Sequence, residues 1–453
     1  MTEPLRSEAG PPAQLSVFDA VVMMLGLVVG IGIFRTPSLV ASGVGSEAMF
    51  ILVWLVGGLV TLIGALCYAE LAAAHPHAGG EYHFLRRALG RPVATMFGWA
   101  RCTVIQTGSI ALVAFLLGDY VAQVIPLGPH GPAIYAALSV VMLTAINVIG
   151  TAAGKNLQAV VTFVQIGAMV AIIGFGFFGS APPVAVVPIP VPEEAAALGV
   201  AMIFVLLTYG GWNDAASLSG ELRDAPQNIA KVLTLGTALL VTLYVLANMA
   251  LLSILGLDGL RASDAVAADM MRAAAGPSGE MLVTLAIVVA AISTLNATLF
   301  TGGRVFYAMG RDLKLLRWMG VWSQRGSAPA NAQIVQAAIA LALIAMGSTT
   351  PDGFKAMVDY TAPVFWMFLL MIGCSLFVLR WREPHRKMPF KVPLYPLTPV
   401  LFCLTSAYML YASVMHTGVA ALVGIGVLIA GTPILFLQPT NPHPTSDPPG
   451  DPP

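Results

Sequence analysis

Two pairs of glycines interrupt apolar stretches of the sequence and could bind a small zwitterion with backbone atoms. Gly30 and Gly32 interrupt the stretch 18–44, and Gly210–Gly211 interrupt the stretch 195–219. A broken helix exposes N–H groups, which suit a carboxylate, and C=O groups, which suit an ammonium group. Such a pair of clusters fits a free α-amino acid better than a sugar, a nucleobase or an inorganic ion. The alternative is that the glycines only let two helices approach closely.

Polar and aromatic side chains surround the second interruption. Tyr209 and Trp212 could close over a bound substrate, or they could only pack against neighbouring helices. Asn213 could hydrogen-bond a substrate or a neighbouring helix. Asp214 could carry a proton, although a helix-stabilising or interfacial role is more common for such a residue.

Other polar residues inside apolar stretches are also candidates. Ser293 and Thr294 form a hydroxyl pair that could coordinate a cation with backbone carbonyls of the first interrupted helix, or could bond their own helix. Arg35 follows the first interruption and could pair with an outward-facing acid or gate an outer vestibule. Glu70 and Asp119 lie near the ends of apolar stretches, where we expect interfacial solvation.

The composition indicates a polytopic membrane protein. Of the 453 residues, 57% are hydrophobic and 10% are charged, and the mean hydropathy is +0.83. The formal net charge of zero implies no nucleic-acid partner. We find no nucleophile–base pair, phosphate loop or Cys/His cluster, so we expect neither an enzyme nor a bound metal or cofactor. Four cysteines fall in apolar stretches and suggest no disulfide framework: Cys67, Cys102, Cys374 and Cys403.

We predict about twelve membrane spans from apolar stretches of roughly 17–30 residues. They lie near 18–44, 48–74, 93–124, 132–149, 155–178, 195–219, 232–255, 280–309, 332–346, 356–379, 398–415 and 418–437.

The distribution of Lys and Arg predicts that both termini are cytoplasmic, in the inner (cell) membrane. The loops on one side hold most basic residues, whereas the opposite loops hold Arg261, Arg272 and Lys355. Residues 1–14 form a polar tail without a secretory signal pattern, and residues 438–453 read as a disordered tail.

An internal repeat follows from the numbering of the spans. Spans 1 and 6 are both interrupted by glycines, and an offset of five spans places the two copies in opposite orientations. This predicts a five-plus-five inverted repeat, with 15–180 and 195–382 as the two copies, a site at the midplane, and two extra helices at 396–437.

Several motifs make the chain similar to bacterial members of the amino acid–polyamine–organocation superfamily, in particular the L-type amino acid transporter branch. The resemblance covers about residues 15–437. The motifs are Gly30-Ile31-Gly32-Ile33-Phe34 with Pro37, Gly79-Gly80-Glu81-Tyr82, Tyr209-Gly210-Gly211-Trp212-Asn213 with Gly220–Pro226, and Leu295-Asn296-Ala297 with Gly303-Arg304.

The resemblance implies a LeuT-type fold and sodium-independent uptake or exchange of amino acids. It also implies binding residues. The amides of Ile31, Gly32 and Ile33, in the break that starts at Gly30, would hold the carboxylate. Backbone carbonyls of Leu207, Thr208 and Gly210 would hold the substrate amine, with Asn213 nearby.

Three residues depart from the family pattern. Ile31 replaces a small hydroxyl residue, and Leu207 replaces a phenylalanine gate. Gln165 aligns with a lysine of the family whose ammonium group takes the place of a bound sodium ion. Either hydrogen bonds alone stabilise this position here, or a cation binds at it with Ser293 and Thr294. The loop 125–131 also lacks the cysteine that links animal relatives to a heavy chain, so we expect no disulfide-linked partner.

We therefore expect a permease that moves neutral L-amino acids by alternating access, as an exchanger or as a proton or sodium symporter, and that is a monomer or a weak homodimer. The alternatives are an amino-acid sensor on the same fold, or a transporter of polyamines or nucleobases.

Overall fold

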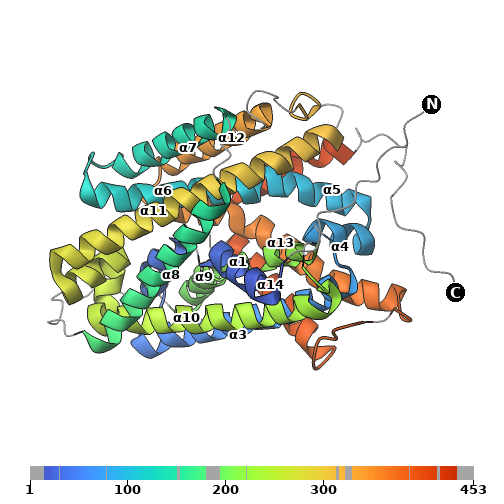
Figure 1. Cartoon of the computed structure of the whole chain (residues 1–453), viewed down its shortest axis with the longest axis horizontal. Coiled ribbons are helices and arrows are strands. Elements are labelled where there is room, and N and C mark those ends of the chain that lie inside the picture. The colour runs from blue at the N-terminus through green and yellow to red at the C-terminus, as the bar shows by residue number, and fades with distance from the viewer. Residues whose placement is uncertain are drawn as a thin grey trace.

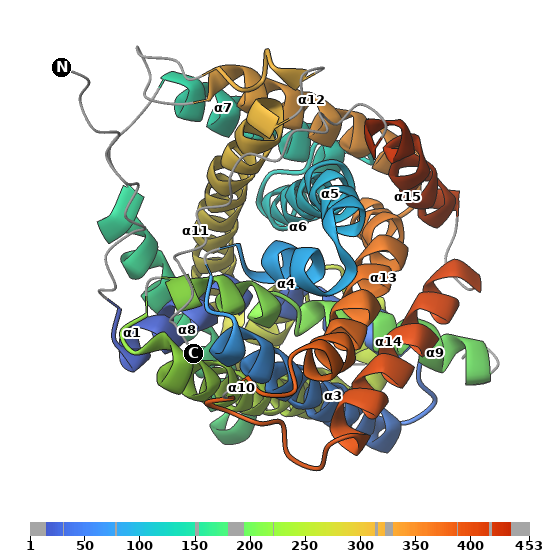
Figure 2. The same cartoon turned by 90° about the vertical axis from the view of Figure 1, so that its right-hand side faces the viewer.

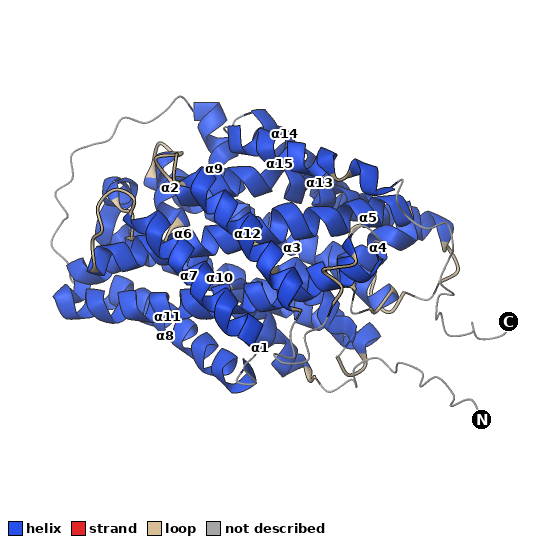
Figure 3. Cartoon of the chain, turned by 90° about the horizontal axis from the view of Figure 1, so that it is seen from above, coloured by secondary structure: helices blue, strands red, loops and turns tan. Residues whose placement is uncertain are grey.

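The computed structural model describes residues 15–29, 31–77, 79–149, 154–179, 194–220, 222–312, 316–321, 329–386, 388–415 and 419–435. Within these ranges the regular structure is helical, apart from an isolated bridge between Leu15 and Leu222 (Figure 3). Among the described residues, eight helices are long and apolar enough to cross a membrane, and shorter apolar helices lie at Val17–Gly26, Phe163–Phe178 and Val419–Leu435. The predicted all-α membrane class is therefore confirmed, and the chain is a multi-pass membrane protein.

In the first half of the chain, the stretch predicted at 18–44 consists of two helices separated by a short 3-10 segment. The elements are α1 (Val17–Val28), η1 (Ile31–Phe34), α2 (Thr36–Ser42), α3 (Glu47–Ala74), α4 (Gly80–Leu89), α5 (Arg91–Ala100), η2 (Arg101–Gln106), α6 (Thr107–Val124), α7 (Gly131–Ile149) and α8 (Gly154–Phe178).

In the second half, the stretch predicted at 195–219 is likewise split. The elements are α9 (Glu194–Thr208), η3 (Trp212–Gly220), α10 (Ala225–Ala262), α11 (Val266–Asp312), α12 (Ala330–Gly347), α13 (Gly353–Arg382), α14 (Leu397–Met415), α15 (Val419–Ala430) and η5 (Thr432–Leu435).

Local sequence explains where the split helices begin and end. Ser16 caps α1, because its hydroxyl accepts from the Asp19 N–H while the Asp19 carboxylate accepts from the Ser16 N–H. Pro37 lies in the first turn of α2, where a missing N–H removes no helical hydrogen bond. Gly211 follows α9 with φ of 99°, a conformation that glycine adopts most readily. The interruptions are therefore encoded by single residues.

The helices pack into two groups (Figures 1 and 2). The first group contains α1, α2, α3, α9, η3 and α10, which contact one another extensively. The second group contains α6, α7, α11 and α12. Helix α8 packs between α10 and α11, while α13 packs against α6, α4, α14 and α15. Both interrupted helices therefore belong to the same group.

Glu70 corrects one expectation from the sequence. Its side chain is buried at the end of α3 instead of lying in interfacial water. The Arg380 guanidinium donates two hydrogen bonds of 2.5 Å to this carboxylate, and the Val392 N–H donates a third of 2.6 Å. A buried carboxylate needs such partners, and this one joins α3 to α13.

Small residues let helices of the first group approach closely. A Cβ atom added at Gly57 in α3 would overlap with Cγ1 of Val205 in α9, and one added at Gly58 would overlap with Cγ1 of Val241 in α10. In contrast, a Cβ added at Gly167 in α8 has open space. The position of α9 against α3 therefore depends on the glycine at 57.

We predict that Gly57→Ala lowers the thermal stability of the purified protein. Overpacking of a core costs about 1–3 kcal/mol, which exceeds the gain of about 1 kcal/mol expected for alanine over glycine in a helix. Gly167→Ala is the matched control and should be neutral or stabilising. Thermal unfolding in detergent measures both, and equal behaviour of the two variants would contradict this packing account.

Candidate functional site

The two interruptions lie against each other. Helix α2 packs on α9, and a Cβ added at Gly32 would be 3.7 Å from Cγ2 of Thr208 and 3.9 Å from its Cα. The structure thus brings together one segment predicted to bind a carboxylate and one predicted to bind an amine. Ile31 and Ile33 lie in η1, and Ile33 is buried. Gly30 falls outside the described residues.

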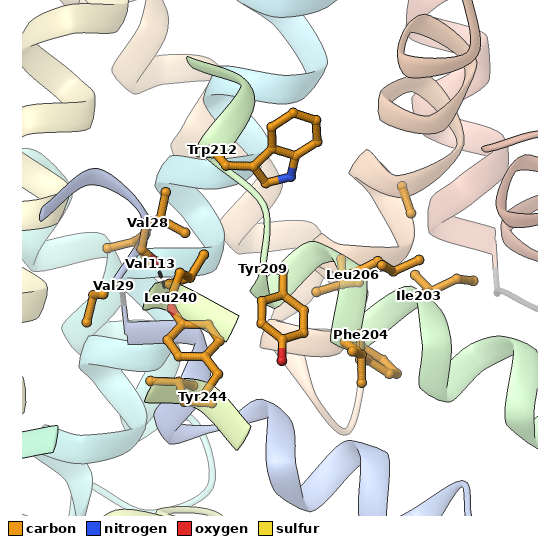
Figure 4. Close-up of a cluster of buried hydrophobic side chains, with 14 of the residues drawn as sticks. Val28, Val29, Val113, Ile203, Phe204, Leu206, Tyr209, Trp212, Leu240 and Tyr244 are labelled. Atoms are coloured by element: carbon orange, nitrogen blue, oxygen red, sulfur yellow. Dashed lines mark hydrogen bonds between the residues drawn. The ribbon is translucent and has the colours of Figure 1, made fainter. Parts of the chain in front are cut away.

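Tyrosine hydroxyls satisfy two carbonyls at the first interruption. The Tyr244 hydroxyl of α10 donates to the Val28 carbonyl at 2.8 Å, where α1 ends (Figure 4). The Tyr120 hydroxyl of α6 donates to the Phe34 carbonyl, also at 2.8 Å. An unpaired carbonyl in an apolar interior is costly, so these hydroxyls stabilise the broken conformation. Because α6 belongs to the second group, Tyr120 also ties the break to that group.

The second interruption is held mainly by its own residues. The Gly210 N–H donates to the Leu207 carbonyl at 3.0 Å, and the Gly211 N–H donates to Oδ1 of Asn213 at 3.2 Å. The Thr208 hydroxyl donates to the Phe204 carbonyl one turn earlier. The Asn213 side chain therefore supports the unwound backbone directly.

The two aromatic residues of this segment pack against helices of the first group. Tyr209 is fully buried, and its hydroxyl donates to the Trp54 carbonyl of α3 at 3.2 Å. Its ring stacks on that of Tyr244, with centroids 5.3 Å apart (Figure 4). The Trp212 ring meets Tyr68 of α3 edge to face at 4.8 Å. These contacts anchor the break to α3 and α10, and closure over a substrate stays a prediction for both residues.

Five residues form a polar network that we call the Glu81 cluster: Tyr68, Glu81 and Asn213, which are buried, and Arg101 and Asp214, which are partly exposed. Glu81 accepts hydrogen bonds from the Tyr68 hydroxyl at 2.7 Å and from Nδ2 of Asn213 at 2.8 Å. Arg101 pairs with Glu81 at 3.1 Å and with Asp214 at 2.8 Å. Burial raises the pKa of the Glu81 carboxyl, although the positive charge of Arg101 opposes this shift.

The Glu81 cluster contains functional candidates that the sequence reasoning missed. Arg101 lies inside the stretch predicted as a span at 93–124, and an arginine there is a candidate by its type alone. It begins the π-helical turn η2, a feature often found at functional sites. Asn213 is predicted to bind substrate or a helix. In the structure it accepts a hydrogen bond from the Gly211 N–H and donates one to Glu81.

A second charged network, the Arg35 cluster, surrounds the arginine that follows η1. Arg35 is buried and contacts three acids: Asp352 at 2.9 Å, Asp264 at 3.1 Å and Asp119 at 3.9 Å. The expected pairing of Arg35 with an acid is therefore present. Asp119 does not lie in open interfacial water, since 20% of its side chain is exposed and it faces Arg35.

The two clusters lie on opposite sides of the interruptions. The bridge between Leu15 and Leu222 places the start of α1 beside the end of η3, on the side of the Glu81 cluster. Arg35 instead follows the first break and leads into α2, which runs away from that side. The two breaks therefore lie between the Glu81 cluster and the Arg35 cluster.

The residues predicted as a cation site are partly assembled. Nε2 of Gln165 in α8 donates to the Thr294 hydroxyl of α11 at 3.3 Å. Oε1 of Gln165 is buried and has no hydrogen-bond partner within the part of the chain that the structure describes. Ser293 precedes Thr294 in the same helix. Among the described residues, no group of three or more His, Cys, Asp or Glu side chains could hold a metal ion.

Comparisons with known proteins agree on one family. The family described as "Amino acid permease" matches residues 15–437. The b(0,+)-type amino acid transporter 1 of Mus musculus is 27% identical over 410 residues, covering 89% of this chain and 82% of the relative. The large neutral amino acids transporter small subunit 2 of Mus musculus is 26% identical, covering 94% and 80%. The serine/threonine exchanger SteT of Bacillus subtilis is 26% identical, covering 94% and 97%.

We predict that Tyr120→Phe and Tyr244→Phe each destabilise the first interruption. Each variant leaves a buried carbonyl without its hydroxyl donor, which costs about 1–3 kcal/mol. Tyr135→Phe is the control, because its hydroxyl donates to the Ile125 carbonyl in an exposed loop. Thermal unfolding of the three variants in detergent gives the comparison, and a control that loses as much stability as the other two would argue against a special role for the break.

Proposed function

This chain belongs to the amino acid permease family, and from that membership we propose that it is a secondary transporter of neutral L-amino acids that works by alternating access. The observation that carries the proposal is the contact between the two helix interruptions, with Gly32 facing Thr208. Backbone N–H groups of one segment suit the carboxylate of a zwitterion, and backbone C=O groups of the other suit its ammonium group.

The proposed binding residues come from both segments. Gly30, Ile31, Gly32 and Ile33 hold the substrate carboxylate through backbone amides. Carbonyls at Leu207, Thr208 and Gly210 hold the ammonium group. Asn213 lies beside them, and Tyr209 and Trp212 restrict access to the bound substrate.

A neutral substrate side chain is supported by the charges around the breaks. Arg35 and Asp214 are the charged residues that follow the two interruptions most closely, and both already have ionic partners. A substrate with a charged side chain would have to compete with those partners or remain unpaired in an apolar interior, which is unfavourable. The same consideration disfavours polyamines, which require free acidic groups.

A LeuT-type arrangement of twelve spans is supported by the two packing groups. Numbered as spans, the first group contains 1, 2, 6 and 7, and the second contains 3, 4, 8 and 9. Each group thus draws equivalent spans from the two proposed repeats, residues 15–180 and 195–382. Rocking of one group against the other around the breaks would expose the site alternately to each side of the inner membrane.

The orientation and partners are also proposals. Both termini are cytoplasmic, so the Glu81 cluster faces the cytoplasm and the Arg35 cluster faces outside. The chain acts as a monomer or a weak homodimer without a disulfide-linked heavy chain. A sensor that binds amino acids without moving them is the second candidate, because a sensor could bind through the same pair of breaks.

The transport mode, exchange or cation-coupled symport, depends on whether a cation binds at Gln165. Exchange is supported by the relative named a serine/threonine exchanger. Cation-coupled symport is supported by the buried Oε1 of Gln165, which is an oxygen ligand without a hydrogen-bond partner in the described chain and lies beside the Thr294 hydroxyl. Together with Ser293, these groups could coordinate a sodium ion or a similar hard cation.

We predict that Gly32→Val abolishes amino-acid binding and uptake. A Cβ at this position already contacts Thr208, so the two additional methyl groups fill the space between the interruptions. Gly45→Val is the matched control, because a Cβ there has no neighbour within 4 Å. Uptake into proteoliposomes is the measurement, and normal uptake by the Gly32→Val protein would rule out the site between the breaks.

We predict that Gln165→Lys removes any dependence of transport on a cation. The lysine ammonium would occupy the position of the cation and donate to the hydroxyl oxygens of Thr294 and Ser293. Gln165→Met, which has a similar size and no charge, is the control. Initial uptake rates with sodium replaced by choline, and at different external pH, give the result; an unchanged cation dependence in Gln165→Lys would mean that Gln165 is not at the coupling position.

A further inference from the structure

Two cysteines face each other where α13 meets α14. The two helices pack side by side (Figure 2). Cys374 belongs to α13 and Cys403 belongs to α14, and their thiols lie within hydrogen-bonding reach of each other. Both cysteines are free. The fold thus brings together two reactive groups from neighbouring helices.

A glycine beside Cys374 lets α14 come close to α13. A Cβ added at Gly373 would lie 2.8 Å from Sγ of Cys403 and 3.0 Å from Cδ1 of Phe402. A larger residue at this position would therefore push the two helices apart. A disulfide requires the Cα atoms of its cysteines to lie within about 7 Å of each other, and helices in such close contact meet this requirement.

The two thiols differ in exposure, and both lie near helix ends. Cys374 is exposed and Cys403 is half-buried. Cys374 precedes the end of α13 at Arg382, and Cys403 follows the start of α14 at Leu397. A small uncharged reagent can therefore reach Cys374 near the edge of the membrane, with Cys403 beside it. An exposed thiol next to a second thiol is the arrangement that yields a disulfide on oxidation.

The other two cysteines are placed differently. Cys67 of α3 and Cys102 of η2 are both 0% exposed. Cys102 belongs to a separate apolar cluster with Phe306 and Met319. Buried structural thiols of this kind are inert toward reagents in solution. Cys67 and Cys102 therefore serve as controls within the same chain.

The chemistry of the pair is a two-electron oxidation by a hydroperoxide. The Cys374 sulfur attacks one oxygen of the O–O bond and loses its proton, which gives a sulfenic acid and releases an alcohol, or water if the oxidant is hydrogen peroxide. The Cys403 sulfur then attacks the sulfenic sulfur, and its proton leaves with the hydroxyl group as water while the S–S bond forms. The two thiols lose two hydrogens and two electrons, which the hydroperoxide accepts. A reducing thiol reverses the link by exchange.

The pair lies at the junction between the two helix groups. Helix α13 packs more extensively against α6 and α12 of the second group than against α3 and α9 of the first. Helix α14, in contrast, packs against α3 and α9. A covalent link between α13 and α14 would therefore join elements on the two sides of this junction.

We propose that Cys374 and Cys403 form a redox-sensitive pair, in which oxidation by a hydroperoxide links α13 to α14 through a disulfide and restrains the rocking of the two helix groups. The disulfide depends on the two thiols alone. The restraint rests on the proposed transport function, because it has an effect only if the groups move.

The first measurement counts thiols. Purified protein in proteoliposomes is treated with hydrogen peroxide, denatured and alkylated with a maleimide. The parent has four cysteines, and we expect all of them to be alkylated before oxidation and only Cys67 and Cys102 after it. Mass spectrometry of the digested protein should find a link between Cys374 and Cys403 that dithiothreitol removes. Four alkylated thiols after oxidation, or a link that involves Cys67, would overturn the pair.

Single variants separate the pair from the other cysteines. Cys403→Ser keeps the size of the side chain, and we expect it to form no disulfide. Cys102→Ala and Cys67→Ala are the matched controls and should form the same link as the parent. Loss of the link in either control, or a disulfide in the Cys403→Ser protein, would contradict the assignment.

The second measurement is amino-acid uptake after complete oxidation. We expect the parent to lose most of its initial uptake rate and to recover it with dithiothreitol, while Cys403→Ser keeps its rate. Oxidised methionines cannot imitate this recovery, because methionine sulfoxide is restored only by dedicated enzymes. Equal losses in the parent and in Cys403→Ser would overturn the restraint.

The redox pair and the transport function can fail separately in these measurements. A link that forms in a parent protein which takes up no amino acid supports the pair and counts against the transport function alone. Conversely, unchanged uptake by fully linked protein would overturn the restraint and leave the transport function in place.

Discussion

The structure depends on one constraint, which is that backbone polar groups released inside a membrane must find partners. The first interrupted helix meets this constraint with side chains from distant parts of the chain, and the second meets it mainly with its own residues. Tyr244 and Tyr120 donate to carbonyls at the first break, and Asn213 accepts from an N–H at the second. The breaks are therefore fixed features with defined partners, and we propose that backbone groups between them bind the ligand.

The same partners connect the breaks to the rest of the protein. Tyr120 belongs to the second group of helices. The Asn213 side chain bonds both the unwound backbone and Glu81, and Glu81 in turn pairs with Arg101 of η2. On the other side, Arg35 pairs with Asp264, just before α11, and with Asp352, just before α13. A charged cluster therefore lies on each side of the breaks in this structure. In the proposed cycle, opening toward one side means breaking one cluster while the other stays intact.

Much of this arrangement was predictable from local sequence patterns. Apolar stretches predicted the helices, and paired glycines predicted the interruptions, because both signals depend only on residues that are close together in the sequence. Gln165 and Thr294 were also expected together, and they are in contact. In contrast, the burial of Glu70 and the Glu81 cluster depend on partners hundreds or dozens of residues away. Neither Gly57 nor Gly58 stands out among 45 glycines, since only the fold shows which of them lie where two helices touch.

The central claim is that this permease moves amino acids through a site between two broken helices. Uptake of a panel of labelled L-amino acids into proteoliposomes of purified protein tests it most directly, with and without internal unlabelled amino acid and with and without sodium or proton gradients. The account predicts uptake of neutral L-amino acids, which either requires internal substrate or follows one gradient. Absence of uptake for every amino acid under all of these conditions would contradict it.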